Sequence, residues 1–266
     1  MTWWMTDSGE VPAGTGTAPL LLVHGWGSDG EDWAPHLPAL TARHRVLVPD
    51  LPGHGRTPAA GFELSPLAVA HRLAAELHRT RTGPVVAVGH SMGGQVVTAL
   101  AVEHPELVRS VVTIATAYGG DPARAGRLPG EQEALRREGV AWALRFVRGA
   151  FTEATPARVR ARHERLMAAM DPAVLLAYRE AMYLAPGAFG LRPAAEGYLA
   201  RRRCPALGLH TGRPAARWEE TTFNHPLSRA VLWEGTGHYP HEERPAELVE
   251  LLIGWCARTG AGGPQG

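Results

Sequence analysis

Lysine is absent from this chain of 266 residues, because all 27 of its basic residues are arginine. This absence excludes Schiff-base chemistry, a pyridoxal-phosphate lysine and the lysine of a phosphate-binding P-loop. Cysteine is nearly absent as well. Cys204 and Cys256 are too few for a disulfide framework or a cysteine-ligated zinc site, and they fit a reducing, cytoplasmic location best.

Long apolar runs and a strong net charge are also missing. No apolar stretch reaches membrane-spanning length, and residues 1–10 lack the basic and then apolar pattern of a signal peptide. The 26 acidic residues nearly balance the 27 arginines, which leaves a formal charge of +1. With 45% hydrophobic residues, the chain is predicted to be a soluble globular protein that binds neither membranes nor nucleic acid.

Short apolar runs alternate with helical stretches along most of the chain. Apolar runs typical of strands buried on both faces occur at 20–23, 45–48, 85–88, 108–114, 205–209 and 229–233. The spacing of apolar residues predicts helices at 65–79, 94–103 and 245–257. This alternation predicts an α/β fold, a mostly parallel twisted sheet with helices on both faces.

Residues 121–203 interrupt this pattern, because they show helical periodicity but no strand of the same type. We predict helices at 135–151, 156–170 and 172–184. Residues 1–120 and 204–258 would then form one α/β core, 121–203 a helical insertion, and 259–266 a disordered tail.

The insertion and the core differ in charge. The insertion holds 15 arginines against nine acidic residues, a net charge of +6, whereas the rest of the chain carries −5. A basic insertion over an acidic core would attract an anionic substrate, such as a carboxylate or a phosphopantetheine carrier. The alternative is that these arginines lie on the solvated faces of amphipathic helices.

The segment Gly89-His90-Ser91-Met92-Gly93-Gly94 directly follows one predicted strand and opens the next helix. A G-x-S-x-G pentapeptide is a weak signal alone, but a strand–turn–helix context gives it a mechanical meaning. The turn is so tight that the serine takes a strained backbone conformation, and small neighbours avoid clashes with the strand and helix. The serine hydroxyl is then presented at the carboxyl end of the sheet.

Two further motifs end other predicted strands. His24-Gly25-Trp26-Gly27 follows the first strand, where a backbone N–H can face an oxyanion, and Gly237-His238 follows the last. Together the three motifs resemble the α/β-hydrolase family over almost the whole chain, and its small esterases and thioester- or lactone-cleaving members most. The insertion matches the lid or cap of that family. The strands that open the family's sheet are reduced in this chain to residues 3–6 or are missing.

The resemblance assigns roles to four residues. Ser91 would be the nucleophile and His238 the general base and then the acid, while the backbone N–H groups of Trp26 and Met92 would form the oxyanion hole. The implied reaction is hydrolysis of a small-molecule ester, thioester or lactone through an acyl-enzyme. No cofactor or metal is implied, since the histidines are scattered and no G-x-G-x-x-G opens the first helix.

The sequence departs from the family at the acid of the triad. The loop that ordinarily carries an aspartate reads His210-Thr211-Gly212-Arg213 and has no carboxylate, and neither has the end of the strand at 108–114. Asp121 is the first candidate for this acid, and Glu219 and Glu220 are the alternatives.

The missing acid keeps two other functions open. One is a non-hydrolytic enzyme of lyase or cyclase type that uses the same serine and histidine, and the other is a non-catalytic ligand-binding protein on this scaffold. For each of these functions the expected partner is a small molecule, and the basic insertion suggests one that is anionic or linked to a carrier. The sequence leaves the oligomeric state open.

Overall fold

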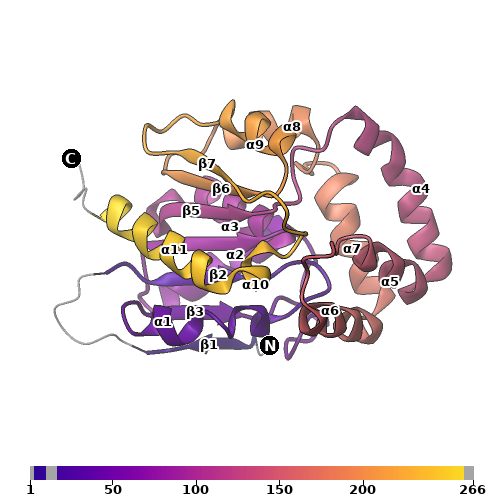
Figure 1. Ribbon diagram of the computed structural model, residues 1–266, viewed down its shortest axis with the longest axis horizontal. Helices are drawn as coiled ribbons and strands as arrows, with labels where there is room; N and C mark the ends of the chain where they lie inside the picture. The colour runs from indigo at the N-terminus through magenta and orange to yellow at the C-terminus, as the bar shows by residue number, and fades with distance from the viewer. Residues whose placement is uncertain (1–2, 10–16, 261–266) are drawn as a thin grey trace.

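The computed structural model describes residues 3–9 and 17–260. Its centre is a seven-stranded sheet in the order β1-β3-β2-β4-β5-β6-β7 (Figure 1). Every neighbouring pair is parallel except β1 with β3, which is antiparallel. The strands are β1 (Met5–Asp7), β2 (Leu20–Val23), β3 (Val46–Pro49), β4 (Val85–His90), β5 (Val108–Ile114), β6 (Ala206–His210) and β7 (Arg229–Leu232).

The six apolar runs all form strands of this sheet, which confirms the predicted fold class. The strands β2, β3, β4 and β6 are buried along their whole length, because helices cover both faces of the sheet. Parallel strands covered in this way read as continuous apolar runs, without alternation. The short β1 forms the edge of the sheet; it begins two residues later and ends one residue later than the 3–6 segment predicted for it.

Two apolar layers hold the helices against the sheet. On one face, α2 (Pro66–Arg79) and α3 (Met92–Glu103) pack against the sheet through Leu73 and Val96. The 3₁₀ helix η1 (Gly30–Trp33), α1 (Leu37–Thr41) and α11 (Pro245–Gly260) cover the other face. There Trp33 of η1 and Trp255 of α11 are buried against the sheet. The remaining core helices are η2 (Pro105–Leu107), α9 (Arg213–Glu220) and α10 (Pro240–Glu243).

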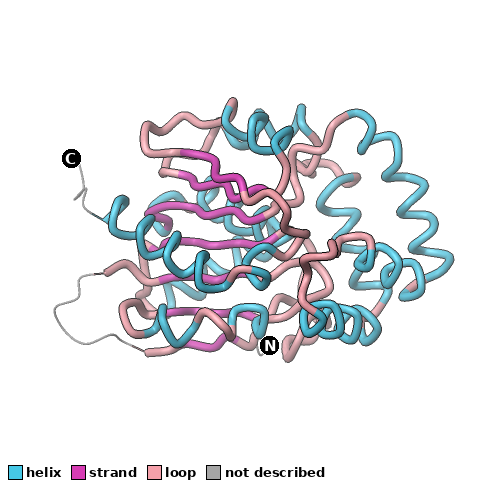
Figure 2. The backbone as a smooth tube through the Cα atoms, viewed as in Figure 1, coloured by secondary structure: helices cyan, strands magenta, loops and turns pink. Residues whose placement is uncertain are grey.

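The segment between β5 and β6 is helical, and it stands beyond the carboxyl ends of the parallel strands (Figures 1 and 2). It contains α4 (Pro122–Glu138), α5 (Val140–Arg148), α6 (Ala157–Ala169), α7 (Pro172–Tyr183) and α8 (Arg192–Leu199). A third apolar cluster joins Leu135, Val147 and Met167 of the insertion to Tyr239 of the α/β core. The insertion therefore packs onto the core through apolar side chains, and it covers the edge of the sheet where active sites of this architecture lie.

Two boundaries differ from the sequence expectation. The helix predicted at 135–151 is two helices, because Gly139 takes a φ of +56° between α4 and α5. The helix α4 also begins 13 residues earlier than predicted, and its internal Pro129 and two glycines hid it.

At the carboxyl end, α11 extends to Gly260, so the first two residues of the predicted disordered tail are helical, and 261–266 lie outside the described residues. None of the helices in residues 3–9 and 17–260 combines the length and apolar character needed to cross a bilayer.

Candidate active site

Ser91 stands at the turn between β4 and α3. Its φ of +51° and ψ of −114° lie in a region that a residue with a side chain rarely adopts. The turn is held by hydrogen bonds from Ser91 N to Ile114 O at 2.9 Å and from Gly94 N to Ser91 O at 3.0 Å. Backbone strain that is held this firmly is typical of functional sites.

The glycines of the turn are needed for close approach. A Cβ on Gly89 would lie 2.2 Å from Gly93 O, and a Cβ on Gly93 would lie 2.4 Å from Val23 O on the neighbouring strand. Both distances are far below van der Waals contact. The small residues therefore let α3 start directly against β2 and β4, and this geometry presents the Ser91 hydroxyl.

His238 meets Ser91 from the loop that follows β7. Its Nε2 lies 3.0 Å from Ser91 Oγ, within hydrogen-bond distance. The backbone on both sides of the ring is held, since His238 N donates to Ala150 O of the insertion at 3.0 Å and His238 O accepts from His90 Nε2 at 2.8 Å. Burial lowers the pKa of His238 to about 4, so its imidazole is neutral at pH 7 and can accept the Ser91 proton.

The two expected oxyanion donors belong to segments next to Ser91. Met92 is the first residue of α3, and Trp26 follows β2 and lines the same cavity as Ser91. Within the part of the chain that the structure describes, the N–H groups of Trp26 and Met92 have no hydrogen-bond acceptor. The indole of Trp26 donates to Leu175 O in α7 at 3.1 Å, which fixes this loop against the insertion.

The structure does not bring any of the three candidate acids to His238. Among the described residues, no carboxylate oxygen lies within 4.0 Å of a nitrogen of His238. Asp121 is exposed at the start of α4, where its carboxylate accepts from Arg124 N at 2.8 Å as the helix N-cap. Glu220 is exposed on α9.

Glu219 is instead fully buried beside His210. Its carboxylate accepts from His210 Nε2 at 2.6 Å and from the Tyr118 hydroxyl, and Arg202 Nη1 lies 4.0 Å away. Burial opposes its ionisation, but His210 and Arg202 hold the pKa of Glu219 below its ordinary value. The loop without a carboxylate thus places a histidine at the end of β6, and that histidine has a buried acid of its own. The one sign of this pairing in the sequence is that His210 opens the loop in which the resemblance leads one to expect an aspartate.

A cavity of about 460 Å³ opens above Ser91 and His238, between the sheet edge and the insertion. Four arginines line the cavity: Arg124, Arg127, Arg179 and Arg192. Asp121 is the acidic residue in the same lining. Arg124, Arg127 and Arg179 share one carboxylate, that of Glu131, with the first two at 3.4 and 3.8 Å and Arg179 in direct hydrogen bond. Three guanidinium groups around one carboxylate leave the cavity with excess positive charge.

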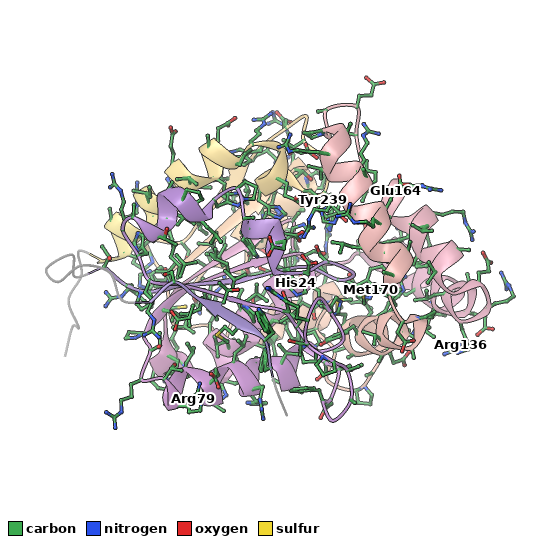
Figure 3. All side chains as sticks on the ribbon, turned by 90° about the horizontal axis from the view of Figure 1, so that it is seen from below. His24, Arg79, Arg136, Glu164, Met170 and Tyr239 are labelled. Carbon is green, nitrogen blue, oxygen red and sulfur yellow. The ribbon has the colours of Figure 1, made fainter. Side chains whose placement is uncertain are left out.

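In the wider neighbourhood, His24 and Tyr239 both lie where the core meets the insertion, whereas Arg136 stands at the far end of the insertion (Figure 3). The residues that line the cavity do not form a group with metal-ligand spacing among the described residues. Two such groups, which share Asp32, lie outside the lining of this cavity.

Known proteins resemble this chain in sequence. The profile of the alpha/beta hydrolase family matches residues 20–251. A pimeloyl-[acyl-carrier protein] methyl ester esterase of Aeromonas hydrophila is 32% identical over 249 residues, which cover 88% of this chain and 93% of the esterase.

Solved structures resemble it in fold. A thermophilic esterase from Thermogutta terrifontis superposes with a TM-score of 0.80 at 24% identity, covering 97% of this chain and 94% of the esterase. An enol-lactonase from Burkholderia xenovorans has a TM-score of 0.79 at 22% identity, with 96% of each chain covered. At such identities the likeness establishes the fold, and chemistry has to be argued from the site.

Proposed function

The chain belongs to the α/β-hydrolase family, and we propose that it is a serine hydrolase that cleaves a small-molecule ester, thioester or lactone through an acyl-enzyme on Ser91. The observation that carries this proposal is the 3.0 Å contact between Ser91 Oγ and His238 Nε2 at the floor of the cavity. Relatives that are named esterases and lactonases support an ester-hydrolysing enzyme.

The proposed mechanism uses four groups of this chain. Ser91 Oγ attacks the acyl carbon while His238 Nε2 takes its proton, and the N–H groups of Trp26 and Met92 stabilise the tetrahedral oxyanion. The imidazolium then donates the proton to the leaving alcohol or thiol. Water then attacks the acyl carbon while His238 removes its proton, the bond to Ser91 Oγ breaks, and His238 returns the proton to Oγ as the acid is released.

The histidine works here without an adjacent carboxylate. In the Ser-His-Asp pattern, replacing the acid with its amide lowers turnover by about 10⁴, because it sets the tautomer and stabilises the imidazolium. In this chain the two backbone contacts of His238, with Ala150 O and His90 Nε2, hold the loop but offer no negative charge to the imidazolium. We therefore propose an activated substrate, a thioester or a strained lactone, in preference to an ordinary alkyl ester.

We further propose that the substrate carries a negative charge remote from the bond that is cleaved. The three arginines that share Glu131 would bind a carboxylate or a phosphate of a carrier-linked acyl group. The insertion, residues 121–203, would then act as a cap that selects the substrate through Arg124 and its neighbours on α4 and α7.

The first experiment tests the activated serine by intact-mass analysis after reaction with a fluorophosphonate. The wild-type protein should form a single adduct, Ser91→Ala none, and His238→Ala an adduct only slowly. Ser8→Ala is the matched control, because Ser8 is a solvent-exposed serine outside the insertion. This variant should label like the wild type. A folded wild-type protein that forms no adduct, while a control esterase does, would overturn the hydrolase proposal.

The second experiment tests the anionic substrate with the monothioester of a dicarboxylic acid and its uncharged methyl-ester counterpart. Loss of a hydrogen bond to a charged group amounts to about 1.5–3 kcal/mol, so Arg124→Gln should lower kcat/KM for the charged substrate roughly 10- to 100-fold. Arg136→Gln, on the outer end of the same helix, should leave it unchanged. Equal rates for the two substrates in the wild type would contradict the proposed selectivity.

A second candidate function rests on the position of the acid. Because no carboxylate contacts His238, the pair Ser91 and His238 would also suit a proton-transfer reaction of lyase or cyclase type. The labelling experiment separates the two, since a proton shuttle does not require a nucleophilic serine. If neither labelling nor turnover is observed, a ligand-binding role of the same cavity becomes the better explanation.

A further inference from the structure

Three buried side chains from separate segments meet at the residue that precedes Ser91 in the chain. They are Asp32 in η1, His90 at the end of β4 and His241 in α10, and each is at most 1% exposed. One potential ligand atom from each residue lies within 4.8 Å of the others. All three lie outside the substrate cavity described above, and the mechanism does not use their side chains.

The two histidines have ring nitrogens without partners. His90 Nε2 donates to His238 O, which leaves Nδ1 as an unprotonated nitrogen with no hydrogen-bond partner among the described residues. Both ring nitrogens of the fully buried His241 are also without a partner in that part of the chain. Buried polar atoms are nearly always satisfied, so three unpartnered imidazole nitrogens in one place indicate a bound species.

The carboxylates nearby give this species a charge. Asp29 and Asp32 share a single guanidinium, that of Arg162, and Glu242 pairs with the imidazole of His163 at 2.5 Å. When all three carboxylates are ionised, they outnumber the guanidinium groups of Arg162 and Arg158 that face them in this largely buried place. A cation would favour the ionised forms, whereas a water molecule would satisfy hydrogen bonds but not stabilise the charge.

The geometry of Asp32 is that of an oriented ligand. One of its oxygens accepts from the Arg162 guanidinium and the other from the Ser28 hydroxyl. Each carboxylate oxygen can accept a second interaction, so these contacts orient the group and leave lone pairs available. In the same way, the bond from His90 Nε2 to a backbone carbonyl fixes the tautomer, as is usual for a histidine that binds a metal.

We propose that Asp32, His90 and His241 form a binding site for a divalent transition-metal ion of zinc-like chemistry. One carboxylate oxygen and two imidazole nitrogens are ligands that Zn²⁺ and its neighbours in the first row prefer. The bound ion has a structural role, because its ligands join η1, the turn that carries Ser91 and the loop that carries His238.

The site adjoins the proposed catalytic pair without belonging to it. His90 precedes Ser91 in the chain, and its other ring nitrogen holds the backbone carbonyl of His238. The bound metal would therefore position His238 relative to Ser91. Metal stoichiometry is measured without any substrate, so a failure of the proposed hydrolase activity would leave this test unaffected.

The test measures zinc in protein expressed in zinc-supplemented medium, because the buried site has to be filled during folding. All variants are made in a His71→Ala, His104→Ala background, since these two imidazoles approach each other to 2.8 Å at the surface and would bind zinc adventitiously. Mass spectrometry should find about one zinc per chain, and about a tenth of that or less in Asp32→Asn and in His241→Asn.

His163→Gln is the matched control. It removes a buried histidine of the adjoining group, Asp32, His163 and Glu242, and zinc should stay at the wild-type level. Loss of zinc in His163→Gln with retention in His241→Asn would overturn the assignment. So would an absence of zinc from the parent protein, which would leave water as the species between the imidazoles.

Cobalt gives an independent measurement if a variant fails to fold. The parent protein expressed with Co²⁺ should show the d–d absorption of a low-coordinate site with nitrogen and oxygen ligands, and folded Asp32→Asn should lose it. A spectrum identical to that of hydrated Co²⁺ in the parent protein would also overturn the proposal.

Discussion

Two buried clusters of carboxylate and imidazole groups adjoin the Ser91–His238 pair, and they differ in how their charges are balanced. The first, the Glu219 cluster, contains Glu219, His210, Tyr118 and Arg202 between β5, β6 and α9. The second, the Asp32 cluster, contains Asp32, His90 and His241. Each cluster has three nitrogens without hydrogen-bond partners among the described residues, on Arg202 in the first and on the two histidines in the second.

The two clusters hold different sets of charges. In the Glu219 cluster one carboxylate faces one guanidinium and three hydrogen-bond donors, and His210, Arg202 and Tyr118 hold the pKa of Glu219 below its ordinary value although burial opposes it. In the Asp32 cluster burial and the nearby Glu242 raise the pKa of Asp32 to about 7. A buried cluster whose charges are balanced inside the protein stabilises the fold by itself, whereas an unbalanced one calls for a ligand.

The largest effect is expected from Glu219→Gln. Arg202 is fully buried, and its acidic neighbour among the described residues is Glu219, 4.0 Å from Arg202 Nη1. The guanidinium nitrogens of Arg202 have no hydrogen-bond partner in that part of the chain. The amide would leave this guanidinium uncompensated, so the free energy of unfolding at pH 7 should fall by about 3–5 kcal/mol in urea titrations.

The exposed neighbour gives the control for this prediction. Glu220→Gln should change the free energy of unfolding by no more than about 0.5 kcal/mol. Adding Arg202→Met to Glu219→Gln should recover part of the loss, because it removes the unpaired charge. A Glu219→Gln protein as stable as the wild type would mean that the first cluster is not held together by its charges.

Much of the fold followed from the sequence, because both faces of the sheet are buried. A strand such as β2 has to be apolar throughout, so it stands out against the amphipathic helix α2. The approach of Ser91 and His238, 147 residues apart, was expected from the family resemblance, and it agrees with the rule that carboxyl ends of parallel strands share one edge.

The surroundings of the pair did not follow from the sequence. The partner of Glu219 depends on how α9 folds back against β6, a tertiary contact with no local pattern. The start of α4 was hidden by Pro129, which is tolerated because packing against α7 and α5 outweighs propensity. The Asp32 cluster gathers residues from positions 32, 90 and 241, and no spacing in the sequence indicates a site of that kind.

Fully partnered histidines supply a reference for both clusters. His24 and His54 each accept a backbone N–H at Nε2, from Leu51 and Gly27, and donate from Nδ1 to a carbonyl. Burial lowers the pKa of His24 to about 4 and of His54 to about 3. Since the unfolded chain binds protons near pH 6.5 and the folded one does not, stability is complete above pH 6.5 and falls below it.

The expected slope between pH 6.5 and 4.5 is about 1.4 kcal/mol per pH unit for each of these two histidines. Unfolding in urea at several pH values would measure it. His54→Gln keeps an acceptor and a donor near the same positions but does not titrate, so its slope should be lower by the contribution of one histidine. Identical slopes in the two proteins would show that the fold does not oppose protonation of His54.

The smallest effect is expected from Asp32→Asn in protein prepared without zinc. Because the pKa of Asp32 is raised to about 7, a large fraction of the carboxyl group is already neutral at pH 7, and the amide resembles that form. Arg162 also keeps Asp29 as a partner, so the loss of one charged hydrogen bond should lower the free energy of unfolding by about 1–2 kcal/mol. In zinc-loaded protein the same substitution should also abolish the stabilisation by the ion, and the difference between the two preparations reports that stabilisation directly. A loss in zinc-free Asp32→Asn as large as that of Glu219→Gln would show that the second cluster is as well balanced as the first, and the contrast between them would then disappear.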